Sequence, residues 1–331
     1  MTKPLTLDVA TERFAYREPF RIAGHVFHET RVVVARLSDG THTGRGEAAG
    51  VYFMGDDVAA MTAAMERVRP AIEAGADRAA LQTLLPPGGA RNALDCAFWE
   101  LEAKRAGAPV WQLAGVPEPR PLRTTITLGA GEPAAMARAA ERLTDARSLK
   151  LKLTGEWPLD AERVAAVRAA RPECWIAVDA NQGYAIEGLA ALTQRMVELG
   201  IELIEQPLAR GHEGDLDGAR RPIPVAADES VLSLAELDRA AGRFDTINIK
   251  LDKCGGLTEG LALARAARDR GFDIMVGNMM GTSLAMAPAY VLGQLCDVVD
   301  LDGPTFLAAD REPSVTYANG DIHCDAAVWG S

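Results

Sequence analysis

The first 50 residues contain three runs that read as strands, and hydrophobic and polar side chains alternate most clearly over residues 5–11. This alternation is typical of strands with one buried face. Asp39-Gly40 separates the last two alternating runs, and this pair favours a tight hairpin turn. Residues 17–28 and 50–55 break the alternation and are predicted to form two exposed loops, the first of them a long flap. The predicted strands are 5–11, 31–37 and 42–48.

After these strands, apolar residues recur at helical spacing over residues 58–75 and 89–107. Strands followed by helices predict an α+β unit of about 110 residues. Residues 109–121 contain four prolines and read as the passage to a second unit. We therefore predict a capping domain over residues 1–120.

From residue 123 onwards, short apolar runs alternate with Ala-rich amphipathic segments such as 159–170 and 257–270. Connections of this length place consecutive strands parallel, and eight such strands favour a closed barrel. An open doubly wound sheet is the alternative, but no G-x-G-x-x-G motif follows the first strand, which counts against a dinucleotide-binding version. The predicted strands are 124–128, 148–153, 175–179, 201–205, 225–228, 246–251, 274–277 and 298–301.

The barrel is predicted to span residues 121–302. The remaining tail, 303–331, contains two strand-like segments at 314–317 and 321–324. We predict that this tail returns to the capping domain.

The composition excludes several classes of partner. The 331 residues are 48% hydrophobic and 24% charged, with a net charge of −11, which argues against nucleic acid and anionic membranes. No apolar run approaches the roughly 20 residues of a membrane span, and the N-terminus lacks a signal-peptide core, so we expect a cytoplasmic protein. Five scattered cysteines without a C-x-x-C pair predict free thiols.

Charged residues end five consecutive predicted strands of the barrel, 22 to 27 residues apart. These residues are Lys152, Asp179, Glu205, Asp228 and Lys250. In a barrel all five converge on one mouth, where active sites lie. A single acidic residue after a strand often caps the next helix, but three together would repel one another unless a divalent cation lies among them. Oxygen ligands favour Mg²⁺, with Mn²⁺ second.

Lys152 and Lys250 flank the predicted metal site, an arrangement typical of two bases on opposite faces of a substrate. The neighbouring Lys150 and a dication would lower the pKa of a lysine base from its usual value of about 10.4. Lys150 is a candidate donor to a substrate carboxylate. The alternative for Lys250 is a helix cap or a surface lysine, and its alternation with Asp252 predicts that these two residues pair.

Several short motifs resemble the enolase superfamily, and more narrowly its muconate-lactonizing subgroup. The resemblance covers nearly the whole chain and implies an α+β capping domain over a modified TIM barrel of the form (β/α)7β. It also implies a lysine base on each side of the site. The motifs are Lys150-x-Lys152, Asp179-Ala-Asn181, Glu205-Gln-Pro207, Asp228-Glu229-Ser230 and Lys250-x-Asp252, with Gly46-Glu47-Ala48 and residues 90–95 in the cap.

Residues 250–259 and Asp300-Leu301-Asp302 are similar to those of the L-Ala-D/L-Glu (dipeptide) epimerases. This resemblance implies that Asp300 and Asp302 bind the substrate ammonium group, and that Thr125 and Asn278 contact the substrate. A helix-capping pair is the alternative for the two aspartates. The implied activity is Mg²⁺-dependent epimerisation of a dipeptide, with one metal per subunit and a two-base 1,1-proton transfer through a metal-stabilised enediolate.

One residue departs from the family pattern. Gly24 stands where epimerases of this family can carry an arginine that binds an acidic second residue of the dipeptide. We therefore expect the second residue of the dipeptide substrate to be neutral or apolar. Muconate-type cycloisomerisation and o-succinylbenzoate synthesis remain alternatives, although their substrates lack an ammonium group. A catalytically silent metal-binding barrel is the alternative from another class. The sequence leaves open whether the chain forms a homo-oligomer and which lysine serves which enantiomer.

Overall fold

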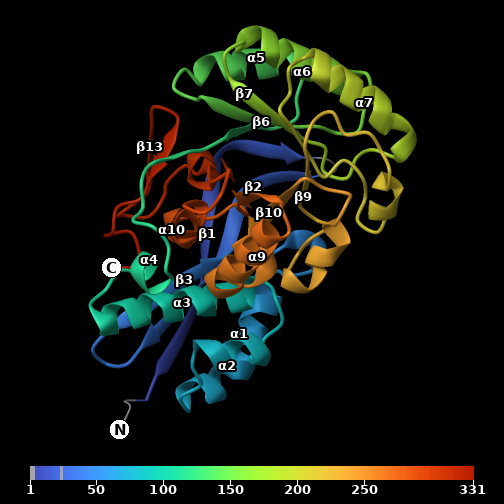
Figure 1. Ribbon diagram of the computed structural model, residues 1–331. Coiled ribbons are helices and arrows are strands. Elements are labelled where there is room, and N and C mark those ends of the chain that lie inside the picture. The colour runs from blue at the N-terminus through green and yellow to red at the C-terminus, as the bar shows by residue number, and fades with distance from the viewer. Residues whose placement is uncertain (1–3, 23–24) are drawn as a thin grey trace.

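The computed structural model describes residues 4–22 and 25–331. Figure 1 shows a cap at the bottom, with the N-terminal strands and the blue-green helices, below a barrel that carries the remaining helices on its outside. No helix among the described residues is long and apolar enough to cross a membrane.

The cap sheet is antiparallel in the order β1-β2-β3, with bounds Thr6–Ile22, His25–Ser38 and Thr43–Ala48. The long flap predicted over residues 17–28 is wrong, because β1 and β2 continue as a paired hairpin to Ile22 and His25. The period-two signal is lost there because the register is irregular between Ala15 and Phe20. Gly24 lies outside the described residues. The second loop contains a short 3₁₀ helix, η1 (Tyr52–Met54).

Three helices cover the cap sheet: α1 (Val58–Glu73), α2 (Arg78–Leu84) and α3 (Gly89–Ala106). The sequence analysis missed α2. Nearly all of α3 is buried, since it contacts β3 on one side and two barrel helices, α8 (Leu251–Cys254) and α9 (Leu257–Asp269), on the other. Glycines in β3 allow this approach, because a Cβ atom at Gly46 would lie 2.0 Å from the carbonyl oxygen of Ala93.

We expect Gly46→Ala to lower the free energy of unfolding by about 3 kcal/mol, because the added methyl group meets backbone that cannot rotate away. Gly131→Ala is the matched control, since its Cβ would meet only Met136 Cγ at 3.7 Å. Denaturant unfolding of both variants measures the difference. Equal stabilities would show that the packing of β3 on α3 is not tight.

Eight parallel strands form the second sheet in the order β12-β11-β10-β9-β8-β7-β6-β5. A hydrogen bond of 2.9 Å from Thr125 N to Val299 O joins its two edge regions, so the strands surround a barrel. The predicted modified TIM barrel is therefore confirmed. The strands are β5 (Ile126–Leu128), β6 (Ser148–Lys152), β7 (Trp175–Asp179), β8 (Leu203–Glu205), β9 (Val225–Ala227), β10 (Thr246–Lys250), β11 (Asp273–Gly277) and β12 (Val298–Val299).

Seven crossovers connect these strands, as expected for a (β/α)7β barrel. The connections after β8 and β9 contain 3₁₀ helices, η2 (Glu213–Leu216) and η3 (Leu234–Ala240). After β12 only the 3₁₀ helix η4 (Gly303–Phe306) and two strands follow, and all of this segment is described. The α-helices on the barrel are α5 (Pro133–Arg142), α6 (Leu159–Ala170), α7 (Ile186–Glu198), α8 (Leu251–Cys254), α9 (Leu257–Asp269) and α10 (Ser283–Gly293).

The tail strands β13 (Thr316–Ala318) and β14 (Asp321–His323) form a small sheet with β4 (Leu122–Arg123). The chain end also reaches the segments that precede the barrel. Val110 N, in the short helix α4 (Val110–Leu113), donates to Gly330 O at 2.8 Å, and Trp329 Nε1 donates to Arg45 O of the cap at 2.8 Å. The domain boundaries at residues 120 and 302 remain predictions.

Candidate active site

The site is built on the inward face of consecutive barrel strands. Ala177, Leu203, Ala226 and Met275 form a small buried cluster. Side chains alternate along a strand, so the residues two positions further on point the same way, one layer closer to the carboxyl ends. For β7 and β8 these residues are Asp179 and Glu205, which are paired in the strand register; Asp228 follows directly after β9.

Two lysines flank the three carboxylates. Lys152 precedes them, on β6, and its Nζ lies 2.5 Å from Asp179 Oδ2. Lys250 follows them, on β10, and its Nζ lies 2.6 Å from Asp228 Oδ2. The strand order β6 to β10 thus places one amine at each end of the arc, with Glu205 on the central strand.

The surroundings of Glu205 indicate whether these residues fit a metal ion. Its Oε1 accepts a hydrogen bond of 2.7 Å from Asn248 Nδ2, but its Oε2 is buried without a hydrogen-bond partner. Burial, together with the charge of Asp179, raises the pKa of Glu205 to about 7. A hard cation would satisfy such an oxygen and offset this repulsion.

No three acidic, histidine or cysteine side chains in the described ranges already form a coordination cluster. Lys152 donates a hydrogen bond to Asp179 Oδ2, and Lys250 donates one to Asp228 Oδ2. The donor set still fits Mg²⁺, since it is all oxygen and includes the orphaned atom of Glu205. The assignment of these three residues as metal ligands remains a prediction.

The expected lowering of the lysine pKa does not come from the protein side chains. Burial lowers the pKa of Lys250, but Asp228 and Glu205 outweigh it, and the pKa lies above its ordinary value. The same balance acts on Lys150, where Asp300 contributes most among the acids and the pKa lies well above its usual range. A lysine base here needs further positive charge nearby.

The predicted pairing of Lys250 with Asp252 is wrong. The strand ends at Lys250 and helix α8 begins at once, so the two side chains leave the alternating pattern. Asp252 Oδ1 instead accepts a hydrogen bond of 2.9 Å from Gly50 N in the cap. This contact links the cap loop to α8, the short helix that directly follows the strand carrying Lys250.

Lys253 was missed by the sequence analysis. It is fully buried, and its Nζ donates to Asp228 Oδ1 and to Asp228 O, both at 2.6 Å. A third hydrogen bond, of 3.0 Å, goes to Asn248 O. The only signal in the sequence is a lysine three residues after Lys250, which is too common to identify such a role.

The five candidate substrate-binding residues meet where the barrel closes. Asp300 accepts short hydrogen bonds from Thr125 Oγ1 and Lys150 Nζ, and Asn278 Nδ2 donates to Asp300 O at 2.6 Å. Asp302 Oδ2 accepts from Thr127 N at 2.6 Å. Burial and the charge of Asp300 raise the pKa of Asp302 to about 6.

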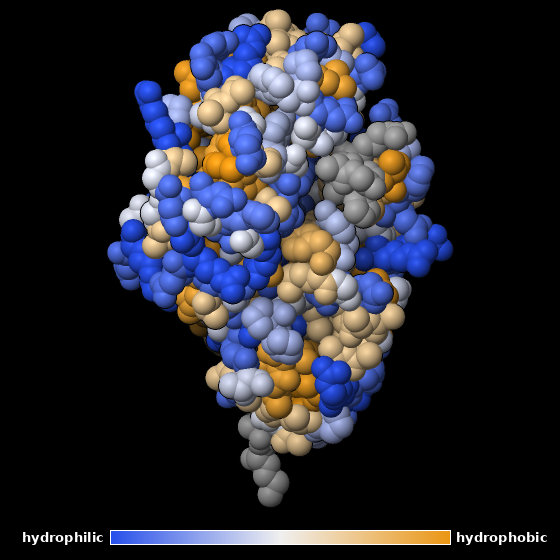
Figure 2. Space-filling view, turned by 90° about the vertical axis from the view of Figure 1, so that its right-hand side faces the viewer, coloured by the Kyte–Doolittle hydropathy of each residue, from blue (hydrophilic) through white to orange (hydrophobic). Residues whose placement is uncertain are grey.

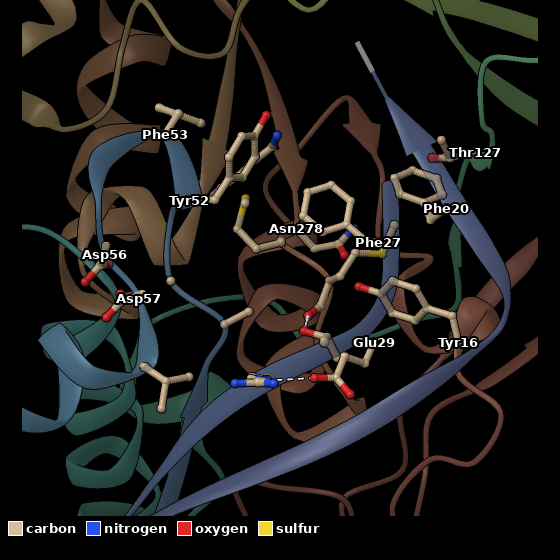
Figure 3. Close-up of a pocket in the computed structure, with 18 of the residues that line it drawn as sticks. Tyr16, Phe20, Phe27, Glu29, Tyr52, Phe53, Asp56, Asp57, Thr127 and Asn278 are labelled. Carbon is tan, nitrogen blue, oxygen red and sulfur yellow. Dashed lines mark hydrogen bonds and ion pairs between the residues drawn. The ribbon is translucent and has the colours of Figure 1, made fainter. Parts of the chain in front are cut away.

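One cavity of about 790 Å³ lies between the barrel mouth and the cap (Figure 3). It brings seven of the ten predicted site residues to one surface, while Thr125, Asp179 and Glu205 lie behind it. The seven are Lys150, Lys152, Asp228, Lys250, Asn278, Asp300 and Asp302. The cavity is therefore the candidate active site.

Comparison with known protein families identifies the family to which this architecture belongs. The enolase C-terminal domain-like family matches residues 135–324, more than half of the chain. The N-terminal domain of the mandelate racemase / muconate lactonizing enzyme family matches residues 5–115. The chain belongs to the enolase superfamily, as its motifs indicated.

Individual relatives are similar over almost the full length. The L-Ala-D/L-Glu epimerase of Escherichia coli K12 is 40% identical over 318 residues, 96% of this chain and 99% of that protein. An enolase family member of Agrobacterium tumefaciens with homology to dipeptide epimerases, bound to sodium and L-Ala-L-Glu, is 40% identical with a TM-score of 0.95, covering 99% and 100% of the chains. The Methylococcus capsulatus dipeptide epimerase, complexed with Mg and L-Arg-D-Lys, is 31% identical with a TM-score of 0.90, covering 97% of each.

Proposed function

We propose that the chain is a Mg²⁺-dependent isomerase that epimerises the second residue of a dipeptide. One observation carries this proposal: Lys152 and Lys250 stand at the two ends of an arc of three carboxylates in a single mouth. Two amines at opposite ends of a site suit the removal of a proton from one face of a carbon and its return to the other. The names of the similar proteins support the same reaction.

Asp179, Glu205 and Asp228 would hold the metal. When bound, Mg²⁺ supplies positive charge that stabilises the negative charge developing on the substrate carboxylate as the Cα proton leaves. Asp179 and Asp228 also orient the amines, through their hydrogen bonds with Lys152 and Lys250. One lysine takes the proton, and the other donates a proton from the opposite face.

Asp300 and Asp302 are proposed to bind the substrate ammonium group. Two carboxylates neutralise a cation well in a water-poor mouth. The substrates of muconate-type cycloisomerases and of o-succinylbenzoate synthases carry no such cation, so this pair favours a dipeptide. A silent metal-binding barrel would have no use for two opposed amines.

We expect Asp302→Asn to raise the KM for a dipeptide with a free amino group by about 10- to 100-fold, because a charged partner of the ammonium group is lost. The KM for the corresponding N-acetylated dipeptide should not rise. Steady-state kinetics on both substrates measures the difference, with the exposed Asp238→Asn as the matched control. An unchanged KM for the free dipeptide would remove Asp302 from the substrate site.

The proposed reaction is tested by incubating the protein with Mg²⁺ and L-Ala-L-X dipeptides in deuterated water. Mass spectrometry should detect one deuterium at Cα of the second residue, and chiral chromatography should detect the D epimer. If no dipeptide exchanges its proton, the proposal fails.

A further inference from the structure

We infer that the cap side of the cavity binds a large uncharged side chain, aromatic or aliphatic, on the residue that is epimerised. This inference rests on the proposed function, because it assigns the substrate class of the same site. It is carried by the aromatic wall of the cavity and by the pairing of every described cation that lines it.

Five aromatic side chains of the cap line the cavity. The β1–β2 hairpin contributes Tyr16, Phe20 and Phe27, and the loop after β3 contributes Tyr52 and Phe53 (Figure 3). The ring centroids of Phe27 and Tyr52 lie 5.9 Å apart and those of Tyr52 and Phe53 lie 5.3 Å apart, both edge to face. The rings of Phe27, Tyr52 and Phe53 therefore form one continuous wall.

This wall remains partly uncovered. Tyr52 and Phe53 keep 43% and 39% of their surface exposed, and Met54 beside them keeps 42%. Figure 2 shows apolar side chains at the surface near the middle of the molecule, where the cap meets the barrel. Uncovered aromatic rings that line a cavity are typical of a binding surface.

Part of this wall shares the cavity with the two lysines. Tyr52 lines the same cavity as Lys152 and Lys250, and its ring contacts that of Phe27. Phe20 lies elsewhere, since its ring packs 4.9 Å from that of Phe306, near Asp302. A substituent on a carbon held between Lys152 and Lys250 would therefore meet Tyr52 and Phe27, whereas Phe20 lies on the ammonium side.

The charges of the cavity disfavour an acidic substituent. Among the described side chains, four cations line the cavity, and each one is bonded to a carboxylate. Arg31 Nε lies 2.7 Å from Glu29 Oε1, and the three lysines pair with Asp300, Asp179 and Asp228 as described above. A substrate carboxylate on the cap side would find no unpaired cation, and burying it there would cost free energy.

A cationic substituent would meet few free carboxylates on the cap side. Glu229 lines the cavity with an Oε2 that has no hydrogen-bond partner, but it belongs to the buried barrel mouth, at 3% exposure, and not to the cap. The acids of the cap beside the aromatic loop are Asp56 and Asp57. Asp56 Oδ2 accepts a hydrogen bond of 2.6 Å from Gly89 N, and Asp57 Oδ1 accepts one of 2.8 Å from Ala60 N. Both carboxylates therefore already cap helix N-termini. Met279 and Met280 complete the lining on the barrel side, and flexible thioethers adapt to apolar groups of different shape.

The test measures kcat/KM for L-Ala-L-Phe, L-Ala-L-Leu, L-Ala-L-Glu, L-Ala-L-Lys and L-Ala-L-Ala with the full chain and Mg²⁺. We expect the Phe and Leu substrates to exceed the Glu and Lys substrates by about tenfold or more. Phe27→Ala should lower the ratio of kcat/KM for L-Ala-L-Phe to kcat/KM for L-Ala-L-Ala by about tenfold. Phe27→Arg should raise the rate with L-Ala-L-Glu.

Trp157→Ala is the matched control, because Trp157 is an exposed aromatic residue that does not line the cavity. It should change no ratio among the five substrates. Exchange that is fastest with L-Ala-L-Glu or L-Ala-L-Lys would overturn the inference and leave the proposed function standing. Absence of exchange with all five dipeptides would instead overturn the proposed function.

Discussion

Replacing Lys152 or Lys250 by alanine is expected to abolish epimerisation, with a loss of about 10³-fold or more in kcat. The reason is the geometry of the mouth, where each amine lies at one end of the carboxylate arc and no other described lysine takes its place. Each single variant should still exchange the Cα proton of one enantiomer, because the remaining lysine reaches its own face. The two variants should therefore retain exchange with opposite enantiomers.

Deuterium incorporation measured separately with L,L- and L,D-dipeptides resolves this pattern. Calorimetric titration with Mg²⁺ should show that both variants still bind the metal. Lys104→Ala is the matched control, because Lys104 Nζ bonds only to cap groups, including Thr43 O at 2.7 Å. Near-normal epimerisation by either active-site variant would refute the two-base mechanism.

The barrel could be predicted from the sequence because its strands carry two signals at once. Trp175–Asp179 has the same bounds in prediction and structure, since an apolar run there ends abruptly at a charge. A charged residue at the carboxyl end of a predicted strand is also expected at the barrel mouth, because the carboxyl ends of all strands meet there. Lys152, Asp228 and Lys250 reached a common cavity for the same reason.

The cap and the supporting contacts could not be predicted in the same way. The hairpin to Ile22 and His25 is held by backbone pairing across an irregular register, which leaves no period in the side chains. The contact of Asp252 with Gly50 joins residues 202 positions apart. Lys253 Nζ donates to four acceptors on other segments, three of them backbone oxygens. Such contacts depend on tertiary packing, so local patterns do not encode them.

Lysines and carboxylates lie next to one another in the mouth, and this explains how many charged side chains can be buried together. Lys150 lies between acids at the ends of three strands. Its Nζ contacts Asp300, lies 3.5 Å from Glu205 Oε2 and lies 4.0 Å from Asp179 Oδ2. Each lysine thus lowers the cost of burying its neighbouring carboxylates. Glu205 Oε2 and Glu229 Oε2 are carboxylate oxygens of the mouth that remain without a hydrogen bond.

Glu205→Gln is expected to reverse the effect of Mg²⁺ on stability. In chelator, the variant should be more stable than the natural protein by about 1–3 kcal/mol, because it removes a buried carboxylate whose Oε2 has no hydrogen-bond partner. The amide oxygen can keep the hydrogen bond from Asn248 Nδ2.

At saturating Mg²⁺ the order should invert, because only the natural protein gains binding free energy from the ion. Thermal unfolding of both proteins, with chelator and with saturating Mg²⁺, measures the two stability differences. The epimerase activity of the variant should fall by about 10³-fold or more. Glu198→Gln, at an exposed acid in α7, controls for the loss of one negative charge. A variant that Mg²⁺ stabilises as strongly as it does the natural protein would place the metal elsewhere, since the orphaned oxygen of Glu205 is the feature that requires it here.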